Sequence, residues 1–257
     1  MLTIDLTEKV ALVLGGSRGI GAGIVEALAR AGALTFFTYT GNPQRREQVE
    51  SLLARIESGG GRARAIICDG CDASETNRVV NGIAGEHGTV DILVPNVGQN
   101  LPGPAEDVTD DQWRQFIDVN LTTAFYGVRA VLPHMLNARS GRIILIGSSV
   151  VYDGGGDSIE YASGKAALGG MMRYLVKNYA RKGILVNVVH PCVIDTDLLR
   201  ERYDNQEKRE RLAAQVPLGR LGQPSDIGSL VAYLASPHGD FICAQEILVD
   251  GGRTFFR

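Results

Sequence analysis

Cysteine is scarce in this chain, with four among 257 residues. That number is too small for a disulfide scaffold in a chain of this length, so reduced thiols are expected. Cys68 and Cys71 have the Cys-x-x-Cys spacing, but no second pair of ligands accompanies them. We therefore expect no metal site and no redox centre at these residues.

The sequence also lacks long apolar runs and a strong charge of one sign. No apolar run approaches the roughly 20 residues that span a bilayer, and the first residues lack the basic and apolar regions of a signal peptide. The formal net charge is −3, with both signs mixed along the chain, so there is no basic stripe for nucleic acid. We expect a cytoplasmic protein that binds neither membranes nor nucleic acids.

What the chain does contain is a regular alternation of short apolar runs with helical patterns. The runs show little polar alternation, as is typical of strands buried on both faces. The expected strands are residues 10–14, 34–39, 64–68, 92–94, 142–147, 185–189 and 246–249, and the expected helices are residues 19–30, 43–58, 74–87, 110–136, 158–181 and 224–235. The pattern predicts an α/β protein with one domain over residues 1–257, a Rossmann-type doubly wound parallel sheet with helices on both faces.

One segment, residues 195–216, interrupts this alternation with a high density of charge. One interpretation is a solvated helical surface. The other is a lid over the substrate, because ligands of such sheets bind beyond the carboxyl ends of the strands.

A glycine-rich turn follows the first expected strand, where residues 15–21 read Gly-Gly-Ser-Arg-Gly-Ile-Gly. Glycines let the backbone turn tightly and let a pyrophosphate approach the N–H groups at a helix N-terminus, where the helix dipole favours an anion. Its position between a strand and a helix indicates a dinucleotide site.

A second group of residues is suited to proton transfer at a carbonyl oxygen. Tyr161 and Lys165 lie four residues apart, on one face of an expected helix, and Ser148 ends the strand before it. A free tyrosine has a pKa of roughly 10, and a nearby cation favours the phenolate.

These residues together resemble the short-chain dehydrogenase/reductase family, in particular its 3-oxoacyl-carrier-protein-reductase-like branch, from about residue 9 to residue 252. The matching positions are the glycine turn, Asp69, Asn96, Gly98, Asn120, Ser148, Tyr161, Lys165, Pro191 and Thr196, and two C-terminal segments at 217–224 and 249–252. The resemblance implies an NAD(P)-dependent oxidoreductase acting on CH–OH or C=O groups.

The resemblance also assigns catalytic roles to four residues. Tyr161 exchanges a proton with the substrate oxygen, and Ser148 polarises that oxygen. Lys165 binds the nicotinamide ribose and lowers the pKa of Tyr161, while Asn120 holds a water that links Lys165 to solvent.

The same resemblance implies a set of cofactor-binding residues. They are Gly15, Ser17, Arg18, Gly19, Ile20, Gly21, Tyr39, Asp69, Gly70, Asn96, Gly98, Tyr161, Lys165, Pro191, Ile194 and Thr196. Two of them have simpler interpretations, since Asp69 could be a turn residue and Thr196 a helix cap.

Several positions depart from the family pattern, beginning with Leu14, which stands where a threonine is usual before the glycine turn. Pro95 cannot donate to a sheet ladder, so the fourth strand must end or adjust there. Cys192 stands where the family has glycine after Pro191, and His190 precedes that proline. Both are expected to place side chains near the nicotinamide.

The end of the second strand favours NADP over NAD. No acid that could accept bonds from a ribose 2′-hydroxyl appears before Glu47, whereas Arg18 lies in the glycine turn and Arg45 and Arg46 follow the strand. A guanidinium can bind a phosphate with two hydrogen bonds. The alternative is that these arginines are solvated and that Tyr39 and Asn42 accept NAD.

The most favoured function is reduction of a ketone or 3-oxoacyl-type substrate. An NAD-dependent dehydrogenase of a sugar, polyol or steroid alcohol is the alternative, and a non-catalytic nucleotide-binding regulator is a remote one. A carboxylate or phosphate on the substrate could meet the basic residues of the lid segment, which are Arg200, Arg202, Lys208, Arg209 and Arg211.

The family resemblance further implies a homodimer or homotetramer paired through the helices at 110–136 and 158–181. The tail 254–257 adds two aromatic side chains that are costly to leave in water, with packing inside one subunit as the alternative.

Overall fold

The computed structural model describes residues 3–154 and 158–255. Part of the predicted tail, residues 256 and 257, therefore lies outside the described residues. Phe255 is described, and its ring lies 6.3 Å from that of Tyr152 in the same chain.

A parallel sheet of seven strands forms the centre of the protein, in the order β3-β2-β1-β4-β5-β6-β7. The strands are β1 (Val10–Leu14), β2 (Leu34–Tyr39), β3 (Arg62–Ile67), β4 (Ile92–Pro95), β5 (Gly141–Ile146), β6 (Ile184–Pro191) and β7 (Glu246–Val249). The strand order reverses between β1 and β4, and ligands of doubly wound sheets bind beyond the carboxyl ends of the strands at this point. The predicted fold class is confirmed.

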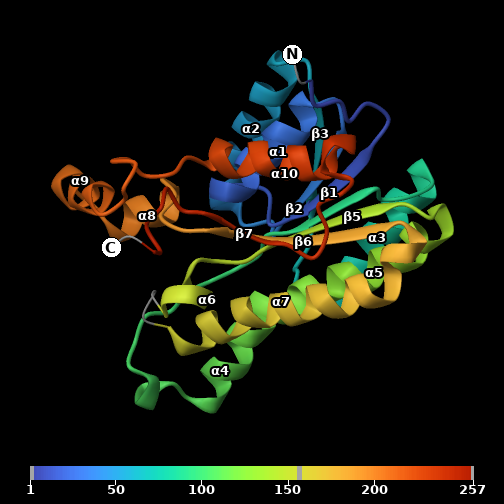
Figure 1. Cartoon of the computed structure of the whole chain (residues 1–257). Helices are drawn as coiled ribbons and strands as arrows, with labels where there is room; N and C mark the ends of the chain where they lie inside the picture. The colour runs from blue at the N-terminus through green and yellow to red at the C-terminus, as the bar shows by residue number, and fades with distance from the viewer. Residues whose placement is uncertain (1–2, 155–157, 256–257) are drawn as a thin grey trace.

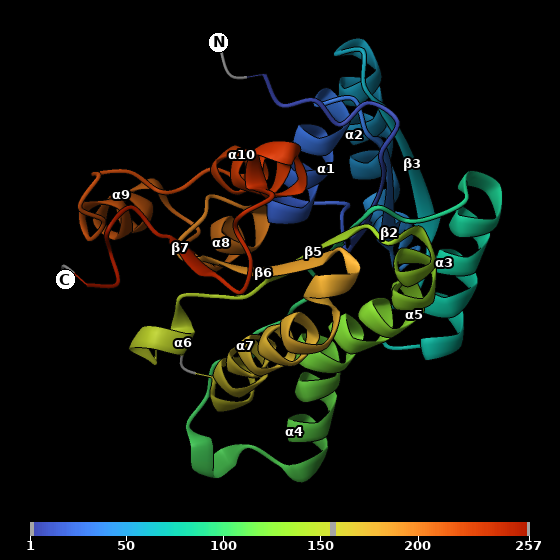
Figure 2. The ribbon, with the colours of Figure 1, turned by 45° about the vertical axis from the view of Figure 1, so that its right-hand side comes forward.

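Helices cover both faces of this sheet (Figures 1 and 2). On one face lie α1 (Gly19–Arg30), α2 (Arg46–Ser58) and α10 (Pro224–Ala235), and on the other lie α3 (Ala73–His87), α5 (Thr123–Ala138) and α7 (Ile159–Tyr179). Alternate strand residues supply the two cores, as Ala11 and Val13 pack on the first side and Leu12 and Leu14 on the second. Burial on both faces explains why the strands are continuous apolar runs.

Shorter helices lie near the carboxyl edge of the sheet. They are α4 (Asp110–Ile117), α6 (Val150–Asp153), α8 (Asp197–Arg202) and α9 (Gln206–Ala214). In both ribbon views α9 and the C-terminus lie at one end of the molecule, with α6 below them, and Figure 1 shows α8 beside α9. The charged segment 195–216 therefore consists mainly of two short helices.

Two local predictions have clear outcomes in the structure. β4 ends at Pro95, as expected of a residue with no N–H to donate. The single helix expected over 110–136 is wrong, because a π-helical turn, Asp118–Thr122, separates α4 from α5. There the side-chain amide of Asn120 donates to the carbonyl of Phe116 at 2.9 Å and competes with the backbone N–H for that acceptor.

Within the described residues, no helix is both long enough and apolar enough to cross a membrane.

Candidate active site

The glycine turn packs so tightly that side chains are excluded at several of its positions. A Cβ atom on Gly21 would lie 2.2 Å from the carbonyl oxygen of Gly15, and one on Gly16 would lie 2.5 Å from Cβ of Phe37. Gly15 itself has φ +76°, a conformation that favours glycine. The turn is held from both sides, since Gly15 N donates to Thr38 Oγ1 at 3.1 Å and Asn96 Nδ2 donates to Gly15 O at 2.8 Å.

The start of α1, which this turn leads into, has the features of an anion site. Arg18 is the N-cap residue, its side chain does not cap the helix, and the first turn contains no acidic residue. The first N–H groups of the helix therefore have no side-chain partner at the cap. In addition, Nη1 of Arg18 is buried without a hydrogen-bond partner among the described residues. The free N–H groups at the start of α1 and the unpaired Nη1 of Arg18 fit a dinucleotide phosphate.

The remaining predicted cofactor residues gather at the carboxyl ends of the neighbouring strands. Tyr39 ends β2, Asp69 and Gly70 follow β3, Asn96 and Gly98 follow β4, and Pro191, Ile194 and Thr196 end or follow β6. Ser17, Gly19 and Ile20 belong to the glycine turn and the start of α1.

The simpler interpretations of Asp69 and Thr196 describe real contacts. Asp69 accepts a hydrogen bond from Cys71 N at 2.9 Å, which is a turn contact. Thr196 caps α8, because its hydroxyl accepts from Leu199 N at 3.3 Å. Thr196 also lies against the glycine turn, with Cγ2 3.1 Å from where a Cβ of Gly19 would stand. Thr196 can therefore cap α8 and still lie beside the glycine turn.

Ser148, Tyr161 and Lys165 come together beyond the end of β5. Ser148 follows the strand, and Tyr161 and Lys165 lie one turn apart on α7. Nζ of Lys165 lies 5.9 Å from the centre of the Tyr161 ring and donates to the carbonyls of Val97 and Ile146 at 3.1 and 3.0 Å. The structure thus brings the three predicted proton-transfer residues into one site.

Burial determines the protonation of this site. It raises the pKa of Tyr161 above its usual value, and the Ser148 side chain opposes that shift. The lowering of this pKa by Lys165, which the family resemblance implies, stays a prediction. A raised pKa keeps the phenol protonated at neutral pH, which is the form that can donate a proton.

Lys165 is 3% exposed, and this burial lowers its pKa from 10.5 to about 8. Below pH 8 the amine is charged in both the folded and unfolded states, and the cost of burying the charge is fully present. Between pH 8 and 10.5 the unfolded state binds more protons, so stability rises with pH through this window.

We expect the free energy of unfolding of the natural protein to rise by about 3 kcal/mol relative to that of Lys165→Met between neutral pH and about pH 10.5. Urea denaturation of both proteins across this range measures the difference. A difference that stays constant with pH would contradict the burial of a charged amine at this position.

Asn120 is 1% exposed, and its amide is used by neighbouring backbone. Nδ2 donates to Gln99 O at 2.8 Å as well as to Phe116 O, and Oδ1 accepts from Gln99 N at 3.0 Å. The side chain thereby fixes the loop after β4 beside Lys165. The water-holding role expected of Asn120 would have to use its backbone carbonyl or the remaining lone pair of Oδ1.

Two residues that the sequence patterns did not connect hold Ser148 in place. His190 is fully buried, and its Nδ1 lies 3.1 Å from Ser148 N, while its Nε2 lies 3.1 Å from Glu246 Oε2. Burial lowers the pKa of His190, which favours the neutral ring. Nδ1 also lies 3.0 Å from Ser148 O, so both backbone polar groups of Ser148 face this ring nitrogen. The ring of His190 contacts the backbone of Ser148 and the carboxylate of Glu246, and its expected place near the nicotinamide stays a prediction.

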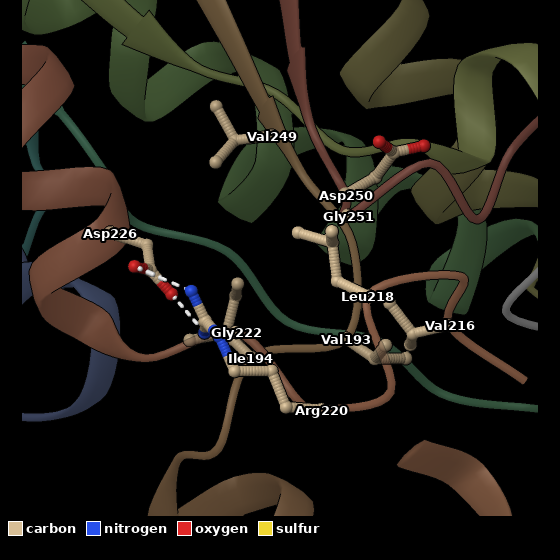
Figure 3. Close-up of a pocket in the computed structure, with 10 residues that line it drawn as sticks. All are labelled: Val193, Ile194, Val216, Leu218, Arg220, Gly222, Asp226, Val249, Asp250 and Gly251. Carbon is tan, nitrogen blue, oxygen red and sulfur yellow. Dashed lines mark hydrogen bonds and ion pairs between the residues drawn. The ribbon is translucent and has the colours of Figure 1, made fainter. Parts of the chain in front are cut away.

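A cavity of about 250 Å³ lies between the segments that follow β6, α9 and β7 (Figure 3). Its lining includes Val193 and Ile194 after β6, Val216 and Leu218 after α9, and Gly251 after β7. Arg220 and Asp226 form an ion pair at 2.7 Å on its wall. Ile194, which was predicted to bind the cofactor, lines this cavity, whereas Ser148, Tyr161 and Lys165 are not among its lining residues.

Comparisons with known proteins agree with this geometry. Residues 15–254 match the enoyl-(acyl carrier protein) reductase family. The chain is 38% identical over 249 residues to the 3-oxoacyl-[acyl-carrier-protein] reductase FabG of Escherichia coli (strain K12). The aligned residues make up 97% of this chain and 98% of that protein.

Two solved structures are also similar. A blue fluorescent protein from a metagenomic library, in complex with NADPH, has a TM-score of 0.86 and 38% identity over 97% of this chain and 99% of its own. The second is a protein from Beutenbergia cavernae with bound NADP, provisionally assigned as an NAD(P)-dependent gluconate 5-dehydrogenase. Its structure has a TM-score of 0.89 and 31% sequence identity, and the match covers 98% of this chain and 99% of that one. The chain therefore belongs to the short-chain dehydrogenase/reductase family and is an NAD(P)-dependent oxidoreductase that acts on C=O or CH–OH groups.

Proposed function

We propose that this protein uses NADPH to reduce the carbonyl group of a ketone or a 3-oxoacyl thioester. The observation that carries the proposal is the convergence of Ser148, Tyr161 and Lys165 beside the glycine turn. The similarity to the Escherichia coli 3-oxoacyl-[acyl-carrier-protein] reductase supports the substrate class, and the bound NADPH and NADP of the two similar structures support the cofactor.

The dinucleotide would supply the hydride, and the chain would manage the proton and the orientation of the substrate. Tyr161, with its raised pKa, holds the proton at its phenol oxygen and donates it to the substrate oxygen. Ser148 polarises the same oxygen, and its backbone is fixed by His190. The ammonium of Lys165 has three N–H donors, and two of them are used by the carbonyls of Val97 and Ile146. The third donor would bind the nicotinamide ribose.

The phosphate end of NADPH would lie on the glycine turn and the start of α1. Arg18 is the arginine best suited to the 2′-phosphate, because it combines a place at the turn with an unpaired buried donor. Arg45 and Arg46 are already engaged, with Gln48 at 3.2 Å and with Glu50 at 3.0 Å.

A second candidate function is oxidation of the secondary alcohol of a sugar, polyol or steroid. The observation in favour of the sugar class is the similarity to the Beutenbergia cavernae structure. The remote possibility of a regulator without catalysis is less well supported, since such a protein has no need for a proton donor held between Ser148 and Lys165.

An absorbance assay of cofactor oxidation or reduction separates these functions. Ketones, 3-oxoacyl thioesters and polyols would be tested with NADPH, NADH and their oxidised forms. We expect the highest specificity constant for carbonyl reduction with NADPH. Turnover confined to alcohols with NAD would support the second function, and cofactor binding without any turnover would support the regulator.

We also propose that the protein is a single domain in which residues 195–216 cover the substrate. Their position in α8 and α9, at the carboxyl edge of the sheet, supports this role. A cytoplasmic location is proposed as well, and the four free cysteines support it.

A homodimer or homotetramer paired through α4, α5 and α7 is the proposed assembly. Exposed aromatic side chains on these helices support it, since Trp113, Phe125 and Tyr174 are 41%, 44% and 63% exposed. We expect light scattering to give a dimer or tetramer at micromolar concentration and Phe125→Glu to shift it toward the monomer. A monomeric natural protein would contradict this assembly.

A further inference from the structure

Three of the five cations of the lid segment are paired with carboxylates. Arg200 pairs with Asp195 at 2.8 Å, Lys208 with Asp204 at 2.8 Å, and Arg211 with Glu207 at 2.5 Å. Arg209 of the same segment donates to neutral acceptors, which are Tyr203 O at 2.8 Å and Gln206 Oε1 at 3.1 Å. These contacts support the solvated helical surface that was one of the two interpretations of residues 195–216. A second candidate partner for an anionic group on the substrate lies outside this segment.

Arg253 is such a partner. It lies in the turn that follows β7, two residues after Gly251. Its Nη1 donates to Sγ of Cys192 at 3.4 Å, and its Nη2 donates to Oε1 of Gln215 at 3.1 Å. Its Nε is buried and has no hydrogen-bond partner within the described part of the chain. The guanidinium is thus positioned by two neutral groups.

The acidic residue closest in sequence, Asp250, is committed to the turn itself. Its Oδ1 accepts from Gly252 N at 2.9 Å and its Oδ2 from Thr254 N at 2.8 Å. Within residues 3–154 and 158–255, no carboxylate forms an ion pair with Arg253. A partly buried guanidinium without a counter-ion is costly, and a bound anion would offset that cost.

Arg253 contacts the segment after β6 and the segment after α9, and Phe255, two residues further along, contacts a third segment. Cys192 follows Pro191, whose carbonyl accepts from Ser149 N at 2.9 Å, so it is close to the backbone of Ser148. Gln215 follows α9, and the ring of Phe255 lies against Tyr152 of α6. The cavity in Figure 3 adjoins the same three segments through their neighbours Val193, Val216 and Gly251.

We propose that Arg253 binds a carboxylate carried by the substrate, so that the preferred substrate is an oxo acid or the matching hydroxy acid. This inference rests on the proposed function and names its substrate class. A guanidinium presents parallel N–H donors that match the two oxygens of a carboxylate, and the unpaired Nε completes such a pair with a neighbouring Nη. Cys192 and Gln215 would then hold the orientation of the side chain.

The test uses a series of oxo carboxylates in which the ketone and the carboxylate are separated by one to four methylene groups, each with its methyl ester. Specificity constants for NADPH-dependent reduction are measured for the natural protein, Arg253→Gln and Arg253→Lys. Arg64→Gln, which removes a cation paired with Glu86 on the surface, is the charge-matched control.

We expect the natural protein to prefer at least one acid over its ester. Arg253→Gln should lower the acid-to-ester ratio of specificity constants by about 10- to 100-fold, mainly through KM of the acid, as loss of a charge-assisted hydrogen bond predicts. Arg253→Lys should restore part of the ratio, and Arg64→Gln should leave it unchanged.

Three results would overturn the role of Arg253. They are an unchanged ratio in Arg253→Gln, equal losses for acid and ester, and reduction of 3-oxoacyl thioesters with no turnover of any oxo acid. The proposed function would survive all three. It would fail if the natural protein reduced none of the acids, esters or thioesters.

Discussion

Replacement of Tyr161 by Phe is expected to lower kcat by at least about 10²-fold. The substitution removes one oxygen atom and keeps the ring on α7 one turn from Lys165. That oxygen is the proposed proton donor, because burial holds the phenol in its protonated form. A positioned general acid contributes roughly 10²–10⁴-fold to a rate, which sets the size of the expected loss.

Cofactor affinity should be nearly unchanged in Tyr161→Phe, since the glycine turn and Arg18 lie on other elements. Steady-state kinetics and fluorescence titration with NADPH separate the two quantities. Tyr179→Phe, at the far end of the same helix, is the matched control and should keep full turnover. Near-normal turnover in Tyr161→Phe would exclude this residue as the acid.

Replacement of Arg18 by Ala is expected to raise KM for NADPH by about 10- to 100-fold and to change KM for NADH by less than about 3-fold. The difference arises because only NADPH carries the 2′-phosphate, and the buried Nη1 of Arg18 has no partner in the described chain. No acidic residue follows β2 before Glu47, so nothing there repels the phosphate.

Arg46→Ala provides the control for loss of charge, because Arg46 pairs with Glu50 on the surface of α2. It should leave both KM values close to those of the natural protein. An equal effect of Arg18→Ala on NADPH and NADH would show that the arginine binds a part that the two cofactors share. A natural preference for NADH would contradict the proposed cofactor.

Much of the fold could be predicted because local and global signals agree. The run of β1 is apolar at every position, and every one of its residues is buried. Helix boundaries with a chemical cause were also predictable, since Thr109 and Gln112 form a capping box at α4 and Pro224 begins α10. The glycine turn was identifiable because its spacing is set by close backbone contacts.

The features that could not be predicted depend on contacts between distant residues. Glu246 meets His190 because the register of β6 and β7 places Glu246 opposite Val188, two residues before His190 and on the same face of the sheet, and His190 in turn contacts Ser148. The π-helical turn depends on the side chain of Asn120 reaching the loop after β4. The pairing of charges in α8 and α9 likewise required the helices themselves, since the sequence left a solvated helical surface and a lid as alternatives.

Arg253 was missed for a similar reason. In the sequence it is an ordinary arginine after a pair of glycines. Its contacts with Cys192 and Gln215 join residues 61 and 38 positions away. Only the folded chain shows that these neighbours are neutral and that Asp250 is committed elsewhere.

The central claim is that this site transfers a hydride to a carbonyl carbon while Tyr161 supplies the proton. Reduction of an oxo acid, its ester or a 3-oxoacyl thioester with NADPH deuterated at the transferring position of the nicotinamide tests it most directly. We expect one deuterium at the carbinol carbon of the product, formed at least about 10²-fold more slowly by Tyr161→Phe. Cofactor binding with no deuterium in any product, or equal rates for the two proteins, would contradict the claim.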